Sequence, residues 1–360
     1  MDVTARARAI HDTLPVVDGH NDWPWALRTQ PDGPFHTDVD RLLAGGVGAQ
    51  FWSVYVPADL QEPFVTTLEQ IDLVERLAAE DDRLVMAPTM NDVAEAQRQG
   101  RIACLLGAEG GHSIEGDRGN LRELFDRGVR YLTLTHSDTN DLGDSATDDP
   151  IHGGLSDLGR LVVAEMNRIG MLVDISHVSA ATMRDVLDVS TTPVIASHSG
   201  AHALAPHPRN VPDDVLQAVG ARGGVVMVVF FPGFLVRSTA EAMVDMFDDM
   251  RRIRAEHRGD EAAIAAEMDR VESALDLDLG SVADVADHVE HIAAVAGIDA
   301  VGLGSDFDGM SLTPSGLADV SCYPAITEEL LRRNWSEGDV RKVLGDNARR
   351  VLRDVATAGA

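Results

Sequence analysis

Short apolar runs that each stop on a potential metal ligand are the feature that most constrains how this chain can fold. Residues 171–176 form one such run and are followed by His177, and residues 193–197 form another that is followed by His198. Between them Ser179 precedes an amphipathic stretch and is expected to cap a helix. A strand–helix–strand unit places its two strands parallel and side by side. We therefore expect both histidines at one edge of a sheet.

The same pattern recurs along the whole chain. Helical patterns lie between most of the runs, for instance at residues 68–79 and 158–168. Eight β runs alternating with helices predict a (β/α)8 barrel. A doubly wound open sheet is the alternative, but no glycine-rich dinucleotide loop follows the first run. The eight predicted strands are residues 16–20, 47–56, 102–108, 131–135, 171–176, 193–197, 224–230 and 300–305.

One segment interrupts the repeat. Residues 237–281 are helical in pattern and heavily charged, which predicts an inserted helical pair or a lid between the seventh and eighth strands. No linker composition separates this segment from the rest. We therefore expect residues 1–360 to form a single barrel domain that carries this insertion.

The composition of the chain limits which partners it is expected to bind and in which cell compartment it is expected. The formal net charge of −29 argues against nucleic acid or an anionic membrane as partner, and its simplest explanation is a solvated surface. No secretory leader or membrane-spanning run is apparent, and the 2 cysteines lie far apart, so a cytoplasmic protein is expected. The sequence leaves open whether the protein forms a homo-oligomer.

Side chains at the predicted strand ends carry the chemistry. They are standard ligands for divalent cations, and a barrel gathers them at one mouth. Asp22 or Asp306 could instead cap a helix, and His136 could be a core histidine. However, three carboxylates in a partly dry pocket are unfavourable without a cation, so their joint placement predicts a metal site. The residues are His20, Asp22, Glu109, His136, His177, His198 and Asp306.

Lysine usage narrows the kind of metal site. Some barrel hydrolases bridge two metals through a carbamylated lysine at a strand end, but the single lysine of this chain, Lys342, lies beyond the last predicted strand. A carboxylate must then act as the bridge. Glu109 is the natural candidate, since it is expected to lie between the His20 and Asp22 pair and the His177 and His198 pair.

Seven motifs, in order and spanning nearly the whole chain, resemble the renal (membrane) dipeptidase family of zinc peptidases, which have amidohydrolase-type barrels. The motifs are VDGHND at residues 17–22, GAEGGHS at 107–113, YLTLTHS at 131–137, DISHVS at 174–179, VIASHS at 194–199, RNVPDD at 209–214 and GSDFDG at 304–309.

This resemblance implies a two-zinc site and a dipeptidase activity. His20 and Asp22 would hold one Zn²⁺ and His177 and His198 the other, with Glu109 bridging them. It also implies three further roles: His136 contacts the scissile carbonyl oxygen, Arg209 the substrate carboxylate, and Asp306 transfers protons. The family often tolerates a C-terminal D-residue, and some members open β-lactams.

The chain also departs from the family in ways that concern specificity rather than the zinc site. An acidic stretch, residues 137–141, follows His136 where mammalian members carry a cysteine. Residues 230–233 read Phe-Phe-Pro-Gly, unlike the corresponding stretch of those members. We also expect neither the lipid anchor nor the secretory leader of those members.

A mechanism follows from these parts. Two zinc ions would share a bridging water and lower its pKa to about 7, which yields hydroxide at neutral pH. The hydroxide would attack the peptide carbonyl, with His136 stabilising the oxyanion and Asp306 moving the proton to the leaving amine. A deaminase or N-acyl-amino-acid deacylase on the same barrel is the alternative enzyme, and a non-catalytic metal-binding scaffold is the other alternative.

Other polar residues have structural explanations. We expect His112 to support the site or its loop, and His288 and His291 to lie on a helix surface or in packing. His202 and His207 could line the pocket mouth. From its neighbours alone, Arg209 could equally pair with the aspartates at 213 and 214 at a helix start that Asn210 or a neighbouring residue would cap.

Overall fold

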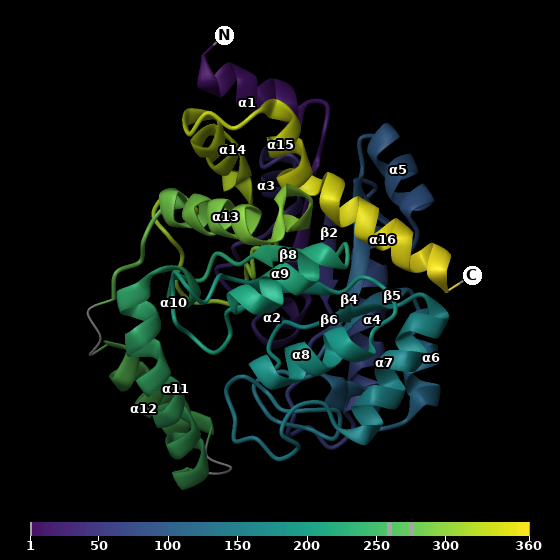
Figure 1. Cartoon of the computed structure of the whole chain (residues 1–360), viewed down its shortest axis with the longest axis vertical. Coiled ribbons are helices and arrows are strands. Elements are labelled where there is room, and N and C mark those ends of the chain that lie inside the picture. Colours follow the sequence, from purple (N-terminus) through teal and green to yellow (C-terminus); the bar gives the residue numbers. More distant parts are fainter. Residues whose placement is uncertain (1, 258–260, 274–276, 360) are drawn as a thin grey trace.

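The chain forms a closed barrel of parallel strands surrounded by helices, in a computed structural model that describes residues 2–257, 261–273 and 277–359 (Figure 1). Strand β9 pairs back with β1, which closes the ring and confirms the predicted (β/α)8 barrel. In their order around the barrel the strands are β1 (Val16–Asn21), β2 (Val47–Ser53), β4 (Ile102–Glu109), β5 (Val129–Thr133), β6 (Leu172–Asp174), β7 (Ile195–Ser199), β8 (Val225–Val228) and β9 (Val301–Leu303).

A ninth strand was not predicted from the sequence. Strand β3 (Leu84–Met86) pairs only with the first residues of β4, with Leu84 opposite Ile102. It therefore extends the barrel wall at the end where the strands begin. A run of three apolar residues is too short for periodicity to reveal a strand.

Several predicted strands are shorter in the structure. Strand β6 ends at Asp174, so His177 lies in the following connection, whereas His198 lies inside β7. Likewise β5 ends at Thr133, before His136. The carboxyl ends of these strands still share one edge of the barrel, so the expected gathering of side chains is unaffected.

Helices follow most of the strands and cover the barrel (Figure 1). The predicted helices at 68–79 and 158–168 fall inside α4 and α7, and Ser179 caps α8 as expected, accepting a hydrogen bond from the Thr182 amide. The helices are α1 (Val3–His11), α2 (Trp23–Thr29), α3 (Val39–Ala44), α4 (Pro63–Glu80), α5 (Met90–Arg98), α6 (Arg118–Asp126), α7 (Asp157–Ile169), α8 (Ala180–Val189), α9 (Asp213–Ala221), α10 (Pro232–Leu235), α11 (Arg237–Glu256), α12 (Glu261–Ser273), α13 (Val282–Ala296), α14 (Tyr323–Arg332), α15 (Glu337–Arg341) and α16 (Asn347–Ala358).

Helices α11 and α12 occupy the segment where an insertion is expected. They lie side by side and extend away from the barrel, at the lower left of Figure 1. The Thr239 hydroxyl donates to the Asp278 carbonyl at 2.7 Å, so the chain leaves and rejoins the barrel at neighbouring points. Residues 258–260 and 274–276 of the expected insertion lie outside the described residues.

Apolar side chains fill the barrel from the end where its strands begin. Val17, Leu105 and Met227 point into one buried cluster that also contains Val351 and Leu352 of α16. Helix α16 therefore covers this end of the barrel with apolar surface, which stabilises the closed wall. Polar side chains are left to the opposite end, where the strands finish.

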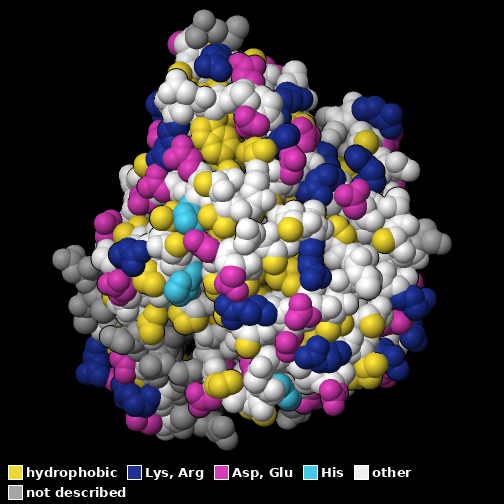
Figure 2. Space-filling view, viewed as in Figure 1, with side chains coloured by type: hydrophobic (Ala, Val, Ile, Leu, Met, Phe, Trp, Pro, Cys, Tyr) yellow, Lys and Arg dark blue, Asp and Glu magenta, His cyan; other side chains and the backbone are white. Residues whose placement is uncertain are grey.

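The surface mixes both signs of charge. Acidic and basic side chains are interspersed over the face shown in Figure 2, as expected for a solvated acidic protein. Among the described residues, no helix combines the length and the apolar character that crossing a bilayer requires.

Candidate metal centre

Glu109 stands at the centre of the cluster that the strand ends form. It is the last residue of β4, and its two carboxylate oxygens face different neighbours. Oε2 lies 3.5 Å from Nε2 of His20, while Oε1 lies 3.0 Å from Nε2 of His177 and 3.4 Å from Nε2 of His198. Asp22 Oδ2 lies 3.2 Å from the same nitrogen of His20. The five predicted ligands therefore meet in one place.

Two groups of potential ligands share Glu109. His20, Asp22 and Glu109 form one group and Glu109, His177 and His198 form the other, with the ligand atoms of each group within 4.8 Å of one another. All five side chains are buried. This arrangement fits two cations with a bridging carboxylate, as expected for a chain that has no lysine at a strand end.

An unpartnered buried oxygen indicates that this cluster is built for cations. Oδ1 of Asp22 is buried and has no hydrogen-bond partner among the described residues, and Nε2 of His20 faces carboxylate oxygens at 3.2 and 3.5 Å. Leaving a buried oxygen without a partner costs free energy that a bound cation would offset. Nitrogen and carboxylate donors of this kind suit zinc and similar divalent ions, so the residues fit the metals that the resemblance implies.

The ionisation of His177, His198 and Glu109 suits cations, whereas a cation at His20 would have to displace a proton. Burial lowers the pKa of His20, but Tyr131, Glu109 and Asp22 together raise it well above its usual value. Burial lowers the pKa of both His177 and His198 well below the usual value, so both rings are neutral, as a metal ligand must be. Burial alone would raise the pKa of Glu109, but the surrounding histidines hold it well below its usual value. Glu109 is therefore a carboxylate that a cation can bind.

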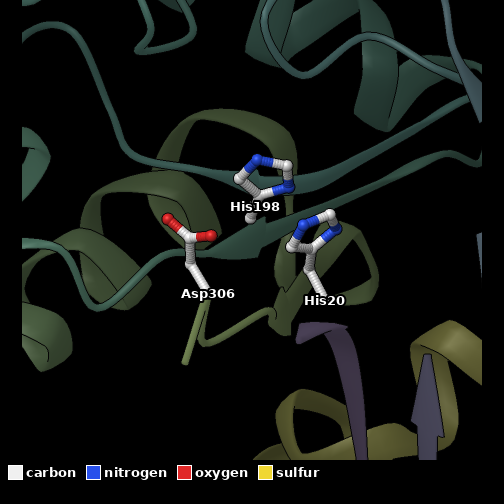
Figure 3. A group of neighbouring side chains, drawn as sticks. All are labelled: His20, His198 and Asp306. Carbon is white, nitrogen blue, oxygen red and sulfur yellow. The ribbon is translucent and has the colours of Figure 1, made fainter. Parts of the chain in front are cut away.

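Asp306 joins His20 and His198 in a third group of close polar atoms (Figure 3). Figure 3 shows its carboxylate turned towards the two imidazole rings. Burial raises the pKa of Asp306 well above its usual value, and the negative charge of Asp22 raises it further. Asp306 is also more exposed than the five buried side chains, so it lies where the cluster meets the open mouth of the barrel.

His136 lies on the other side of Glu109. Its Nε2 is 4.0 Å from Glu109 Oε1, and its ring lies 4.4 Å from that of His177 and 4.7 Å from that of Tyr55. Burial lowers the pKa of His136, which keeps its ring neutral and leaves one ring N–H able to donate. It is half-buried and is therefore accessible from the mouth.

Arg209 is a buried cation beside this cluster. Among the described residues its guanidinium donates to the His198 carbonyl at 3.3 Å and the Ser199 hydroxyl at 3.5 Å, and it lies 5.1 Å from the centre of the Phe234 ring. No carboxylate of the described residues lies within ion-pair distance of it. Burial lowers the pKa of Arg209 to about 10, so the side chain stays charged at neutral pH. The charges of Asp306, Glu109 and Asp174 favour the charged form from beyond ion-pair distance. A buried guanidinium without a direct salt bridge has donors left for an anionic group.

Arg209 does not pair with the aspartates of the next helix. Asp213 contacts His291 at 2.8 Å, and Asp214 contacts Arg184 at 2.7 Å. Asn210 does not cap α9 either, since that helix begins after Pro212 without a side-chain cap. The Asn210 side chain instead bonds to the backbone of Gly200, Ala205 and Phe234, which ties together the loops on both sides of Arg209.

The remaining histidines have structural contacts. His288 is buried in α13, accepts a hydrogen bond from the Ala201 amide and contacts the Leu235 carbonyl, which confirms a packing role. His112 contacts the Val56 carbonyl at 2.8 Å and supports its loop. Neither belongs to a group of potential metal ligands among the described residues.

Asp18 supports the site, although the sequence analysis did not identify it. It is fully buried in β1 and accepts hydrogen bonds from the Ser305 amide and hydroxyl, both at 2.7 Å, and from Gln50 at 2.9 Å. These bonds attach the segment that carries Asp306 to the strand that carries His20. Its position two residues before His20 in the same strand was the available signal, because side chains two apart on a strand point to the same face.

Two site residues have an unusual backbone. His177 and Asp306 have φ values of 66° and 68°, in the left-handed region that residues with a Cβ seldom adopt. Such strain persists only where the surrounding structure holds it, and it concentrates at functional sites. Close packing is equally strict at Gly309, where a Cβ would lie 2.3 Å from Asp22 Oδ2 and 2.7 Å from Asp306 Oδ1.

A parallel barrel with a cluster of histidines and carboxylates at its carboxyl end is the architecture of a metal-dependent hydrolase. Comparison with known proteins agrees. The family model described as membrane dipeptidase, peptidase family M19, matches residues 4–360. The chain belongs to this family of metal-dependent peptidases and is a hydrolase.

Named relatives and a protein of solved structure are similar to this chain over nearly its whole length. The chain is 42% identical to dipeptidase aclJ of Aspergillus oryzae, with 95% of this chain and 78% of that protein covered. It is 39% identical to dipeptidase verJ of Clonostachys rogersoniana, with 98% and 87% covered. A metallo peptidase from Rhodobacter sphaeroides, liganded with a phosphinate mimic of the dipeptide L-Ala-D-Ala, is 26% identical with a TM-score of 0.77, covering 96% of this chain and 100% of that one.

Proposed function

We propose that this protein is a zinc-dependent dipeptidase that hydrolyses the peptide bond of dipeptides, including those with a C-terminal D-residue. The observation that carries the proposal is the placement of Arg209, a buried cation without a carboxylate partner among the described residues, beside a cluster that fits two cations. The names of the relatives aclJ and verJ and the dipeptide mimic held by the Rhodobacter sphaeroides enzyme support the same substrate class.

Two zinc ions would be held by this cluster. His20 and Asp22 would bind one ion, His177 and His198 the other, and Glu109 both. When bound, the ions supply a Lewis acid for the carbonyl and lower the pKa of a bound water to about 7.

Side chains around the cluster would orient the substrate and move its protons. His136, neutral and half-buried, can donate from its ring N–H to the oxygen of the scissile carbonyl as negative charge develops there. Asp306, at the edge of the cluster towards the open mouth, can accept a proton from the attacking water and deliver it to the leaving amine.

Arg209 would measure the length of the substrate. Its guanidinium can bind the free carboxylate that lies one residue beyond the scissile bond through two parallel hydrogen bonds. A longer peptide has no carboxylate at that position. Because the contact is made to the carboxylate, the C-terminal side chain can point either way, which gives a physical reason for tolerance of D-residues.

The test compares a dipeptide with its amide in the wild type and in Arg209→Ala. A charge-assisted hydrogen bond contributes about 1.5–3 kcal/mol, so the variant should lose on the order of 10- to 150-fold in kcat/KM on the dipeptide. On the dipeptide amide, which has no carboxylate, the loss should be much smaller.

Equal losses on the two substrates would show that Arg209 only supports its loop. Analysis of the products also tests the reaction class. Two amino acids are expected from a dipeptide, whereas release of ammonia or of a carboxylic acid from an acylated amino acid would indicate the deaminase or deacylase instead.

A further inference from the structure

His198 is connected through its second ring nitrogen to a buried carboxylate. Its Nδ1 lies 2.8 Å from the Ser197 hydroxyl, and that hydroxyl donates to Asp174 Oδ2 at 2.6 Å. A serine hydroxyl has a single hydrogen, so once it donates to Asp174 it can only accept from His198. Nδ1 of His198 therefore carries the proton. Its Nε2 is left bare where it lies 2.9 Å from Nε2 of His177 and 3.4 Å from Glu109 Oε1.

Asp174 is held so that it can only act as an acceptor. It is fully buried at the end of β6 and accepts four hydrogen bonds. Thr133 and Ser197 donate their hydroxyls to Oδ2, both at 2.6 Å, and the amides of Ser176 and Ser197 donate to Oδ1 at 3.0 and 2.9 Å. Both oxygens of the carboxylate are therefore used as acceptors, and one of them is connected to His198 through a single hydroxyl.

His20 has a different connection behind its ring. Its Nδ1 lies 2.8 Å from the Tyr131 hydroxyl, which donates to the Gly19 carbonyl at 3.3 Å. This chain of hydrogen bonds leads to a neutral peptide group instead of a carboxylate. It selects the same tautomer, but it brings no charge to the ring.

From this difference we infer that Asp174, acting through Ser197, is a positioning residue for His198 that strengthens cation binding at the position shared by His177, His198 and Glu109. A carboxylate behind a metal-binding histidine fixes its ring and makes its free nitrogen a better donor. The other position already has two carboxylates, Asp22 and Glu109, among its ligands. The inference rests on the two-metal site of the proposed function.

A structural role alone is the competing explanation, because Asp174 also joins β5, β6 and β7. Thr133 and Ser197 allow the two roles to be separated. Both donate a hydroxyl to the same oxygen of Asp174 at 2.6 Å, and both are fully buried, but only Ser197 contacts His198. Thr133→Val and Ser197→Ala therefore remove equivalent bonds from Asp174, and only Ser197→Ala breaks the connection to the metal site.

The experiment is a titration of the metal-free full-length protein with Zn²⁺ against a chromophoric chelator. The wild type is expected to bind two ions. In Ser197→Ala one of the two should bind on the order of 10- to 100-fold more weakly, while Thr133→Val keeps both wild-type affinities. Urea unfolding of the two metal-free variants should show similar losses of stability.

Two results would overturn the inference, and they differ from each other. If the two variants bind Zn²⁺ alike, Asp174 has only a structural role and the proposed function is unaffected. If the wild type itself binds no Zn²⁺, the two-metal site is wrong, and the role of Asp174 is lost with it.

Discussion

Glu109 has a place in the site that no other side chain of the described residues shares, because its two oxygens face different groups of ligands. Oε2 faces His20, and Oε1 faces His177 and His198. Asp306 instead lies next to a nitrogen from each group, at the edge of the cluster. Replacing either carboxylate by an amide should therefore have a different effect: one replacement should weaken metal binding, and the other should lower activity.

Glu109→Gln is expected to weaken the binding of both ions, because an amide is a poor substitute for a bridging carboxylate. Asp306→Asn should keep close to two ions per chain while kcat falls by roughly 100-fold or more, since the amide cannot transfer the proton. Elemental analysis and steady-state kinetics on the same preparations check both. Loss of metal from Asp306→Asn would make Asp306 a ligand, and an unchanged metal content in Glu109→Gln would exclude a bridge.

At the scale of helices and strands, ion pairs join neighbouring outer helices around the barrel. Glu165 of α7 accepts two hydrogen bonds from Arg168 one turn later and contacts Arg122 of α6. These arginines lower the pKa of Glu165 to about 2. Both arginines are at least half exposed, at 50% and 62%, so solvent screening reduces what the contact contributes to about 1 kcal/mol.

Glu165→Gln should accordingly unfold at lower urea concentration than the wild type at pH 7. Because the folded pKa is below the unfolded value of 4.5, this contribution is present above pH 4.5 and is lost as the pH falls towards 2. The difference between the two proteins should therefore shrink over that range. Glu123→Gln on the exposed face of α6 serves as the control and should stay within about 0.5 kcal/mol of the wild type. A difference that does not change with pH would contradict the ion-pair explanation.

For the whole molecule, acid sensitivity should come from histidines that are shielded from water and are not among the predicted metal ligands. Burial lowers the pKa of His11 and His288 to about 4 and that of His207 to about 3. The unfolded chain takes up these protons near pH 6.5, well before the folded protein does. Stability is therefore lost as the pH falls from about 6.5 to 4.

His288→Gln should reduce this acid sensitivity. A glutamine amide can replace both hydrogen bonds of His288, to the Ala201 amide and the Leu235 carbonyl, without a group that becomes protonated. Urea unfolding at several pH values should show that the wild type loses about 2 kcal/mol more than the variant between pH 7 and 4. Parallel pH profiles for the two proteins would exclude His288 as a source of the effect.

Local patterns in the sequence were enough to determine the barrel and the residues that meet at its mouth. Apolar runs that repeat with helices between them identify parallel strands, and parallel strands bring their carboxyl ends together. For this reason His20, Glu109 and His198 could be expected in one place although they are far apart in the chain. The absence of a lysine at any strand end made Glu109 the candidate for the bridge.

Only the tertiary structure decided how these residues are supported. Arg209 could equally have paired with the aspartates after it, and only the folded chain places it beside His198 without a carboxylate partner among the described residues. The left-handed backbone of His177 and the connection from Asp174 through Ser197 to His198 have no counterpart in sequence periodicity. They depend on hydrogen bonds between neighbouring strands, whose register and side-chain directions are fixed only when the barrel closes.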